Sequence, residues 1–299
     1  MEPTRILQRA RRHMAESNDA RRRQADCIPR NARRNGNSRH GSSLQGGRLT
    51  GIGGRVIQLG NGQIALGDCL DVMRSVPSAS VDMILCDLPY GTTQNKWDSV
   101  IPFEPLWSEY WRICRGPVVL TAAQPFTSAL VMSCPDRFKY CWVWKKSQAV
   151  GHLNAWKQPM RNTEDIAVFY KNQCIYNPEL IDKKPENIRP QTKRTKTSDN
   201  YGNHGLDVFK CPANKSMPAT IIEFNNEQGT IHPTQKPVAL FEYLIRTYTN
   251  EGDTVMDNCL GSGTTAIAAE NTGRRWIGIE RDPTYFGLAC DRIARAVNA

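Results

Sequence analysis

The 299-residue chain is expected to fold as an α/β protein built on a doubly wound, mainly parallel sheet. Four short runs predict buried strands, because they are apolar with little polar alternation. These runs cover residues 81–86, 117–121, 254–259 and 275–280. Helical stretches such as 103–115 alternate with them, which is typical of parallel strands joined by crossover helices.

The remaining elements follow in chain order. Residues 56–59 and 63–66 predict a hairpin with Asn61-Gly62 as its turn, because this dipeptide favours tight hairpins. A short helix is expected to end at Met73. Later in the chain, a helix is expected at 125–132 and two further strands at 138–145 and 164–170.

The first candidate site is the stretch Asp87, Leu88, Pro89 and Tyr90, which directly follows a predicted strand. It therefore stands at the carboxyl end of that strand, where open α/β sheets bind their ligands. The set suits a flat heterocycle that carries an amino group. We interpret Tyr90 as an exposed ring that stacks on the heterocycle, while Asp87 and the Leu88 carbonyl accept the amino hydrogens. The alternative is a strand that ends in an ordinary proline turn.

The second candidate site is a glycine turn between a strand and a helix. Residues 261–265 read Gly-Ser-Gly-Thr-Thr, and a helix is expected to begin directly after them. Such a turn lets the backbone approach a nucleotide-like ligand closely. It has neither the lysine of a P-loop nor the full GxGxxG spacing. Glu280 ends the next strand and is placed to accept hydrogen bonds from ribose hydroxyls, which favours an adenosine-type cofactor.

Three signatures resemble those of the S-adenosylmethionine-dependent DNA amino-methyltransferases of prokaryotes and phages. The acidic Pro-Tyr signature lies at 87–90, the cofactor signature at 257–265, and His-Pro-Thr-Gln-Lys-Pro at 232–237. The catalytic motif precedes the cofactor motif, which is the beta-type circular arrangement of this family. The resemblance covers residues 56–299.

The resemblance implies a Rossmann-like, seven-stranded sheet and S-adenosyl-L-methionine as the cofactor. The seventh, antiparallel strand is placed at 165–170. The chain departs from the family at Leu88, where a proline is more usual, and at Asn258 and Cys259, where Pro-Phe is usual. The missing aromatic leaves open how the methionine part of the cofactor packs.

The resemblance also assigns residues to roles. Asp68 matches an acid that accepts from the adenine amino group of the cofactor, and a role as helix N-cap is compatible with this. The implied catalytic residues are Asp87, Leu88, Pro89 and Tyr90. The implied cofactor-binding residues are Asp68, Cys69, Lys236, Asp257, Asn258, Gly261, Ser262, Gly263, Thr264, Thr265, Glu280 and Arg281.

The implied reaction is methylation of the exocyclic 6-amino group of adenine in double-stranded DNA, after the base has flipped out of the helix. Asp87 favours adenine, because family members with Asp at this position mostly methylate adenine and those with Ser mostly methylate cytosine. Cytosine-N4 methylation is the alternative. Methylation of RNA or of a protein amide and a non-catalytic DNA-binding role also stay open. No metal is needed, and restriction-modification is one biological role of such chemistry.

Residues 1–55 carry 13 Arg, no Lys and four acids, and so hold about nine of the ten net positive charges. This composition predicts a basic, disordered arm that binds DNA phosphates without reading sequence. A dispensable extension is the alternative. The methyltransferase domain is expected at 56–299, with a target-recognition insertion at 172–231. For that insertion, a solvated surface loop is the alternative.

The composition is that of a soluble, cytoplasmic enzyme. No apolar run reaches membrane-spanning length. Ten cysteines without CxxC pairs indicate reduced thiols and argue against a structural zinc site. The resemblance leaves a homodimer as one assembly to be tested.

Overall fold

The computed structural model describes residues 55–92, 98–188, 211–227, 229, 231 and 234–298. The expected N-terminal arm, apart from Arg55, lies outside these residues, and so does much of the expected recognition insertion. Of the signature at 232–237, only the last four residues are described.

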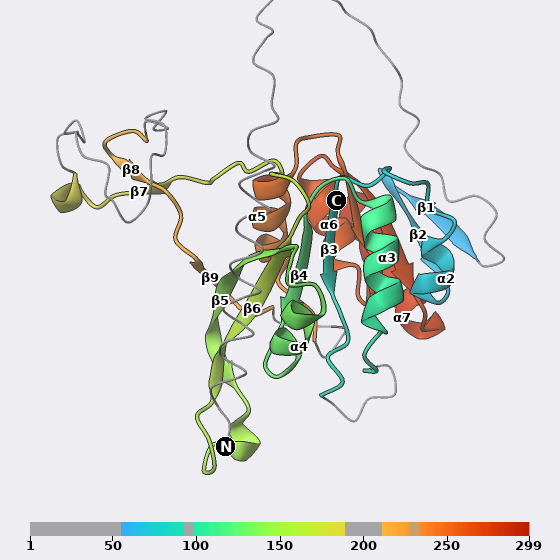
Figure 1. The fold of residues 1–299 in the computed structure, drawn as a ribbon, viewed down its shortest axis with the longest axis horizontal. Coiled ribbons are helices and arrows are strands. Elements are labelled where there is room, and N and C mark those ends of the chain that lie inside the picture. The colour runs from blue at the N-terminus through green and yellow to red at the C-terminus, as the bar shows by residue number, and fades with distance from the viewer. Residues whose placement is uncertain are drawn as a thin grey trace, which may run out of the picture. The chain divides into compact units, whose positions relative to one another are not determined.

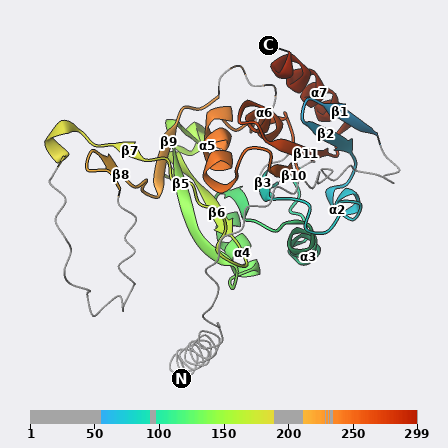
Figure 2. The same ribbon diagram turned by 90° about the horizontal axis from the view of Figure 1, so that it is seen from above.

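One sheet of nine strands organises the described part of the chain (Figures 1 and 2), in the order β1-β2-β11-β10-β3-β4-β6-β5-β9. Its strands are β1 (Val56–Leu59), β2 (Gly62–Leu66), β3 (Met83–Asp87), β4 (Val118–Ala122), β5 (Phe138–Val150), β6 (Arg161–Phe169), β9 (Ile221–Phe224), β10 (Thr254–Asp257) and β11 (Arg275–Glu280). A small separate sheet pairs β7 (Ile181–Asp182) with β8 (Lys215–Ser216).

The strand directions confirm the predicted α/β class. The strands from β2 through β11, β10 and β3 to β4 are parallel. β6 is antiparallel to both of its neighbours, as expected for the strand near 165–170. These strands and β5 make up the seven expected ones, and β1 and β9 extend the sheet at its two edges.

The predicted position of the hairpin turn is wrong. The hairpin turn is Gly60-Asn61, because Leu59 pairs with Gly62 and Gly60 has a φ of +51°. Gly62 is held in β2, where a Cβ would stand 2.2 Å from the Trp276 ring. In addition, residues 221–224 of the expected insertion form β9, which pairs with β5 in the main sheet.

Helices cover both faces of the sheet (Figure 2). One layer holds α2 (Cys69–Met73), α3 (Phe103–Ile113) and α4 (Phe126–Ser133), and the other holds α5 (Val238–Tyr248), α6 (Thr264–Asn271) and α7 (Pro283–Val297). Side chains alternate between the faces of a strand. Thus Ile84 joins the cluster under the first layer, whereas Met83 and Leu85 join the second.

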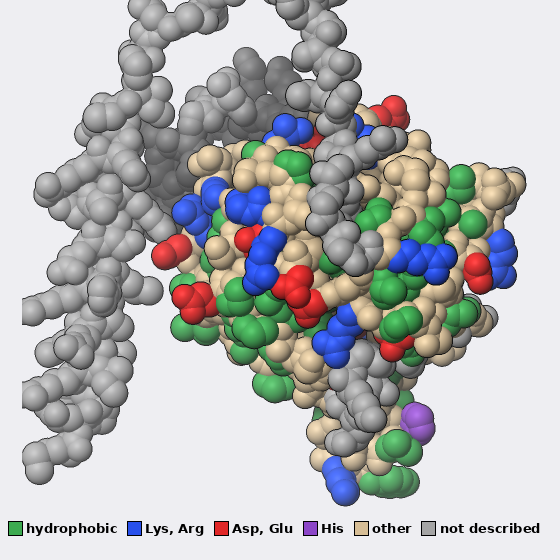
Figure 3. Space-filling model, turned by 90° about the vertical axis from the view of Figure 1, so that its right-hand side faces the viewer, with side chains coloured by type: hydrophobic (Ala, Val, Ile, Leu, Met, Phe, Trp, Pro, Cys, Tyr) green, Lys and Arg blue, Asp and Glu red, His purple; other side chains and the backbone are tan. Residues whose placement is uncertain are grey.

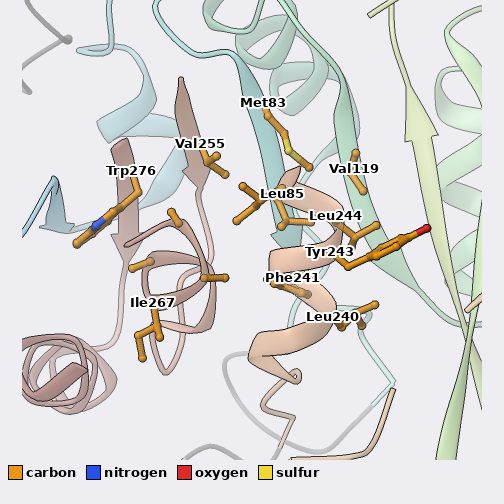
Figure 4. Packing of buried hydrophobic residues seen from close by; sticks show 14 of the residues in the cluster. Met83, Leu85, Val119, Leu240, Phe241, Tyr243, Leu244, Val255, Ile267 and Trp276 are labelled. Atoms are coloured by element: carbon orange, nitrogen blue, oxygen red, sulfur yellow. The ribbon is translucent and has the colours of Figure 1, made fainter. Parts of the chain in front are cut away.

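The second cluster shows why the strands are apolar throughout. Met83, Leu85 and Val119 from the sheet pack with Leu240 and Leu244 of α5 (Figure 4). A strand covered on both sides needs apolar residues at every position, which is the pattern seen in the sequence. No helix in the described part of the chain is long and apolar enough to cross a membrane.

Candidate functional site

The two sequence-predicted sites meet at one edge of the sheet. Asp87, Asp257 and Glu280 are the last residues of the parallel strands β3, β10 and β11. A cavity of about 550 Å³ opens at this edge. Every residue predicted to be catalytic or cofactor-binding lines it, with the exception of Gly263. Residues almost 200 positions apart in the sequence therefore face one space.

Gly263 has a packing role. It adopts a φ of +85° at the start of α6, and a Cβ there would stand 3.0 Å from Ile293 of α7. Gly261 has a φ of +53°, but no atom would lie closer to its Cβ than 3.9 Å. Arg292 of α7 also holds the turn, because its guanidinium donates to the Ser262 carbonyl at 3.0 Å. Sequence analysis missed this arginine.

Buried carboxylates fix the backbone of the glycine turn. Glu280 accepts from the Gly261 N–H at 2.8 Å through Oε2 and from the Asp282 N–H at 2.7 Å through Oε1. Asp257 accepts from the Cys259 N–H at 3.0 Å and from the Thr265 hydroxyl. Burial raises the pKa of Asp257 to about 6 and also raises that of Glu280. The two acids connect the ends of β10 and β11 to the turn.

An aromatic residue from another helix stands beside the Asn258-Cys259 departure. Asn258 accepts from the Tyr110 hydroxyl of α3 at 2.6 Å through Oδ1, and its amide faces the Cys259 sulfur. Cys69 lies beside Cys259, and the hydrogen bond between the two thiols together with burial raises the Cys69 pKa. A thiol with a raised pKa is a poor nucleophile. The pair therefore packs this wall of the cavity without being reactive.

We call the part of the cavity lined by the glycine turn, Asp68 and Glu280 the cofactor half, and the part around Asp87 the catalytic half. The hydrogen-bonding groups of the cofactor half suit an adenosine-type molecule. A carboxylate has about four lone-pair sites, and Glu280 uses three of them for the backbone N–H groups of Gly261, Arg281 and Asp282, so one remains for a ligand. Asp68 is the N-cap of α2 and accepts from Leu70 N at 2.9 Å, while its side chain stays exposed at the cavity. Gln235 lines the same cavity, and its buried Oε1 has no hydrogen-bond partner within the described residues. Such an acceptor suits an N–H group of a ligand.

At the catalytic half, Asp87 belongs to a network of buried polar groups. Its Oδ2 accepts from the Lys236 ammonium at 2.8 Å. Its Oδ1 accepts from the Thr121 hydroxyl and lies 2.9 Å from the Tyr90 hydroxyl. Lys236 also donates to Glu164 Oε1 at 2.9 Å, and Glu164 Oε2 accepts from Lys146 at 2.7 Å.

We call Asp87, Glu164, Lys146 and Lys236 the charge cluster. It contains two acids and two bases, so its formal charges balance. Burial raises the pKa of Glu164, but the ammonium groups of Lys236 and Lys146 outweigh burial and bring that pKa down to about 2. Burial likewise lowers the pKa of Lys236, and Asp87 and Glu164 raise it by more. Glu164 and Lys236 are therefore both charged near neutral pH.

Two sequence-based assignments look different in the structure. Lys236 was grouped with the cofactor-binding residues, but its side chain pairs with Asp87 and Glu164. The prediction that Tyr90 is an exposed ring is wrong. Its ring stacks on Phe126 at a centroid distance of 5.0 Å, and its hydroxyl points into the charge cluster. Burial and the nearby carboxylates raise the Tyr90 pKa, so its hydroxyl keeps its proton.

Sequence analysis missed Glu164 and Lys146. Glu164 begins the predicted strand 164–170, and Lys146 directly follows the predicted strand 138–145. A buried charge requires a partner, so an acid at the start of one apolar strand and a lysine near the end of its neighbour were a usable signal. Within the described residues, no group of His, Cys, Asp and Glu side chains could hold a metal ion.

Comparisons with known proteins agree with this geometry. A family model described as DNA methylase matches residues 133–291. The chain is 27% identical over 246 residues to YubD of Escherichia coli strain K12, a provisionally named methylase, covering 78% of this chain and 90% of YubD. It is 24% identical over 256 residues to the type II methyltransferase M.HpaI of Haemophilus parainfluenzae, covering 79% and 75% of the two chains.

Two solved structures share the fold. The M1.HpyAVI–SAM complex matches with a TM-score of 0.52 and 22% identity, over 77% of this chain and 99% of that one. The cytosine-N4-specific PvuII DNA methyltransferase matches with a TM-score of 0.54 and 16% identity, over 81% and 93%.

Proposed function

Because the chain belongs to the DNA methylase family of N6 and N4 amino-methyltransferases, we propose that it methylates the 6-amino group of adenine in double-stranded DNA. The observation that carries this proposal is the cavity shared by Asp87 and the glycine turn. An acceptor for an amino group and a cradle for an adenosine-type cofactor face the same space. The methyl donor is S-adenosyl-L-methionine, which supplies a methyl group on a positively charged sulfur.

Asp87 prepares the nucleophile. The exocyclic nitrogen of adenine is conjugated to its ring and is a poor nucleophile as long as its lone pair is delocalised. A hydrogen bond to Asp87 and another to the Leu88 carbonyl would draw the two amino protons out of the ring plane. The lone pair then becomes available, and catalysis depends on positioning and electrostatics.

The charge cluster determines how Asp87 receives the base. Oδ1 already accepts from Thr121, whereas among the described residues Oδ2 has Lys236 as its one partner. Oδ2 therefore has a free lone-pair site for an amino proton. Lys236 places a positive charge beside this carboxylate, and Glu164 holds Lys236 from the other side. Tyr90 keeps one ring face on Phe126, so stacking on the target base would use its other face.

The cofactor half is assigned residue by residue. Glu280 and Asp68 accept from the ribose hydroxyls and the adenine amino group, and Asp257 holds the turn through Cys259 N and Thr265. Gly261 leaves room for the ligand, because its Cα faces open space. Cys69, Asn258, Ser262, Thr264 and Arg281 complete the wall.

Adenine is preferred to cytosine on the strength of Asp87, in line with the family tendency for this position. Cytosine-N4 methylation is the second candidate, because cytosine also places its amino group beside a ring nitrogen, and Asp87 could accept from either base. The basic arm at 1–55 favours nucleic acid over a protein amide as the substrate.

The test uses the full chain with radiolabelled S-adenosylmethionine and DNA that carries no methylation. The DNA is digested to nucleosides, and the labelled product is identified as N6-methyladenine or N4-methylcytosine nucleoside. A parallel reaction with RNA tests the other nucleic acid. Label in N4-methylcytosine would replace adenine by cytosine as the target, and label in RNA alone would reject the DNA assignment.

The variant Asp87→Ala separates catalysis from cofactor binding. It should abolish methylation and leave the affinity for S-adenosylmethionine unchanged, because Asp87 contacts the target amino group. Asp71→Ala is the matched control, since Asp71 is an exposed carboxylate on α2 that pairs with Arg74. Retained methylation in Asp87→Ala would refute the mechanism.

A further inference from the structure

The hairpin formed by β5 and β6 extends beyond the rest of the sheet (Figure 1). β4 pairs with β6 only as far as Asp165, and β9 pairs with β5 only as far as Lys146. Past these points β5 and β6 pair only with each other among the described residues, and the 3-10 turn η1 (His152–Asn154) lies between them. Every residue from 147 to 163 is exposed.

This hairpin starts from the rim of the cavity. β5 runs parallel to β9 and antiparallel to β6, which in turn is antiparallel to β4. The end of β5 therefore lies at the same edge of the sheet as Asp87. Val150, Arg161 and Thr163, at the base of the hairpin, line the cavity itself. Whatever occupies the cavity comes close to the hairpin.

The hairpin tip carries apolar side chains that serve no purpose in the fold. Trp156 is fully exposed and Leu153 is 87% exposed, while Val150 and Met160 are each exposed by about two fifths. A single exposed apolar residue is ordinary, but four within eleven residues form a patch that marks an interaction site. A folded hairpin that presents an indole to water indicates a partner with a flat, apolar surface.

The charges of the hairpin identify the kind of partner. Residues 147–163 contain the cations Lys157 and Arg161 and no acid, whereas Lys145 and Lys146, directly before them, already pair with Glu223 and Glu164. Figure 3 shows a protrusion that carries hydrophobic side chains in green, basic ones in blue and a histidine in purple. Basic side chains bind phosphates, and aromatic rings stack on bases, which together describe a nucleic acid.

We propose that the β5–β6 hairpin docks on duplex DNA and that Trp156, with Leu153 beside it, enters the base stack next to the target base. The inference rests on the proposed function, because that reaction requires the target base to leave the stack. A flipped base leaves a gap, and apolar side chains that insert between base steps are a known means of holding DNA in such a state.

The dimensions allow this arrangement. Trp156 at the tip comes six positions after Val150 at the cavity, so the two lie at most about 20 Å apart. That length corresponds to about six base pairs at 3.4 Å each. A duplex that presents a base to Asp87 would therefore lie within reach of the tip, and Lys157 and Arg161 would lie along its phosphates.

Photo-crosslinking tests the contact without requiring turnover. The full chain carries p-benzoylphenylalanine in place of Trp156, or in place of Leu288 on α7 as a control. Irradiation with double-stranded DNA should crosslink the chain through position 156 at least tenfold more than through position 288. Equal crosslinking at the two positions, or none at 156, would overturn the proposal, whether or not the chain methylates DNA.

Methylation rates test the role in the duplex. Trp156→Ala and Leu153→Ala remove side chains that are exposed, so the fold should persist, and a thermal melt checks this. Activity on double-stranded DNA should fall about tenfold, while activity on the same DNA after heat denaturation should stay within twofold, because a single strand has no stack to open. Leu288→Ala should change neither rate. An equal loss on both substrates, or no loss on either, would contradict the insertion of Trp156.

Discussion

Charge balance in the cluster of Asp87, Glu164, Lys146 and Lys236 predicts how its variants behave. Removing Lys236 leaves two buried acids with one base, and removing the charge of Glu164 leaves two bases with one acid. Breaking one partner of a buried ion pair typically costs about 3–5 kcal/mol of unfolding free energy. We expect Lys236→Met and Glu164→Gln each to destabilise the protein, and the double variant to be less destabilised than the sum of the two.

The magnitude follows from the pKa of Glu164. It lies at about 2, against a usual 4.5, which corresponds to about 3 kcal/mol of net favourable interaction for the charged form. This stabilisation is present above pH 4.5 and is lost as pH falls through 2. Glu164→Gln should therefore lower the unfolding free energy at pH 7 by about 3 kcal/mol.

The assay is urea unfolding at pH 7 without cofactor, applied to the wild type, both single variants and the double variant. The double variant restores a neutral cluster, so the two changes should couple by about 2 kcal/mol in the stabilising direction. Additivity within about 0.5 kcal/mol would refute the idea that the cluster acts as one balanced unit. The pair Lys145→Met and Glu223→Gln, which removes an exposed ion pair, is the matched control and should show at most about 1 kcal/mol of coupling.

The dependence on pH supplies an independent check. In Lys236→Met, Glu164 loses the cation that lowers its pKa most, and we expect burial then to bring this pKa above the value in the unfolded chain. A carboxylate whose pKa is higher in the folded than in the unfolded state binds protons more readily when folded. The unfolding free energy of this variant should therefore increase as pH falls from 7 to 5. In the wild type, Glu164 should contribute no change in unfolding free energy between pH 7 and pH 5. A variant whose stability falls towards pH 5 would contradict the assigned cause.

Three further outcomes are expected. Glu280→Ala should weaken S-adenosylmethionine binding by about 1–3 kcal/mol in calorimetry, and unchanged affinity would move the ribose site elsewhere. Burial raises the pKa of Asp257 to about 6, so the unfolding free energy of the apoprotein should increase as pH falls from 8 to 5. Asp257→Asn should remove this increase in urea titrations. Gly62→Ala should destabilise by about 1–3 kcal/mol because its Cβ would meet a buried indole, whereas Gly287→Ala on α7, with open space around it, should stabilise by about 0.5–1 kcal/mol in the same assay.

The strands that carry the site could be predicted because the pattern that identifies each of them lies within its own residues. β3, β10 and β11 are apolar on both faces and end in Asp87, Asp257 and Glu280. A buried strand that stops at a carboxylate can be recognised without knowing its neighbours. Because the carboxyl ends of parallel strands lie at one edge of the sheet, the three carboxylates are then expected near one another.

Features that depend on distant partners were not predictable in this way. Gly60 and Gly62 both flank Asn61, and the ring of Trp276 decides which of them joins the strand. β9 is four residues long and becomes a strand by pairing with β5. Glu164 shows its role only when Lys146 and Lys236 are placed around it.

The charge cluster also explains why the part of the cavity around Asp87 depends on the segment that follows residues 172–231. Asp87, Lys146 and Glu164 come from strands β3, β5 and β6 of the main sheet, whereas Lys236 comes from the loop directly before α5. Without Lys236, the first three would leave an excess negative charge in a buried place, which is unfavourable. Asp87 therefore has its cationic partner only when the loop that carries Lys236 packs against the sheet. Since this loop follows residues 172–231, the catalytic carboxylate takes its cation from the far side of the expected recognition insertion.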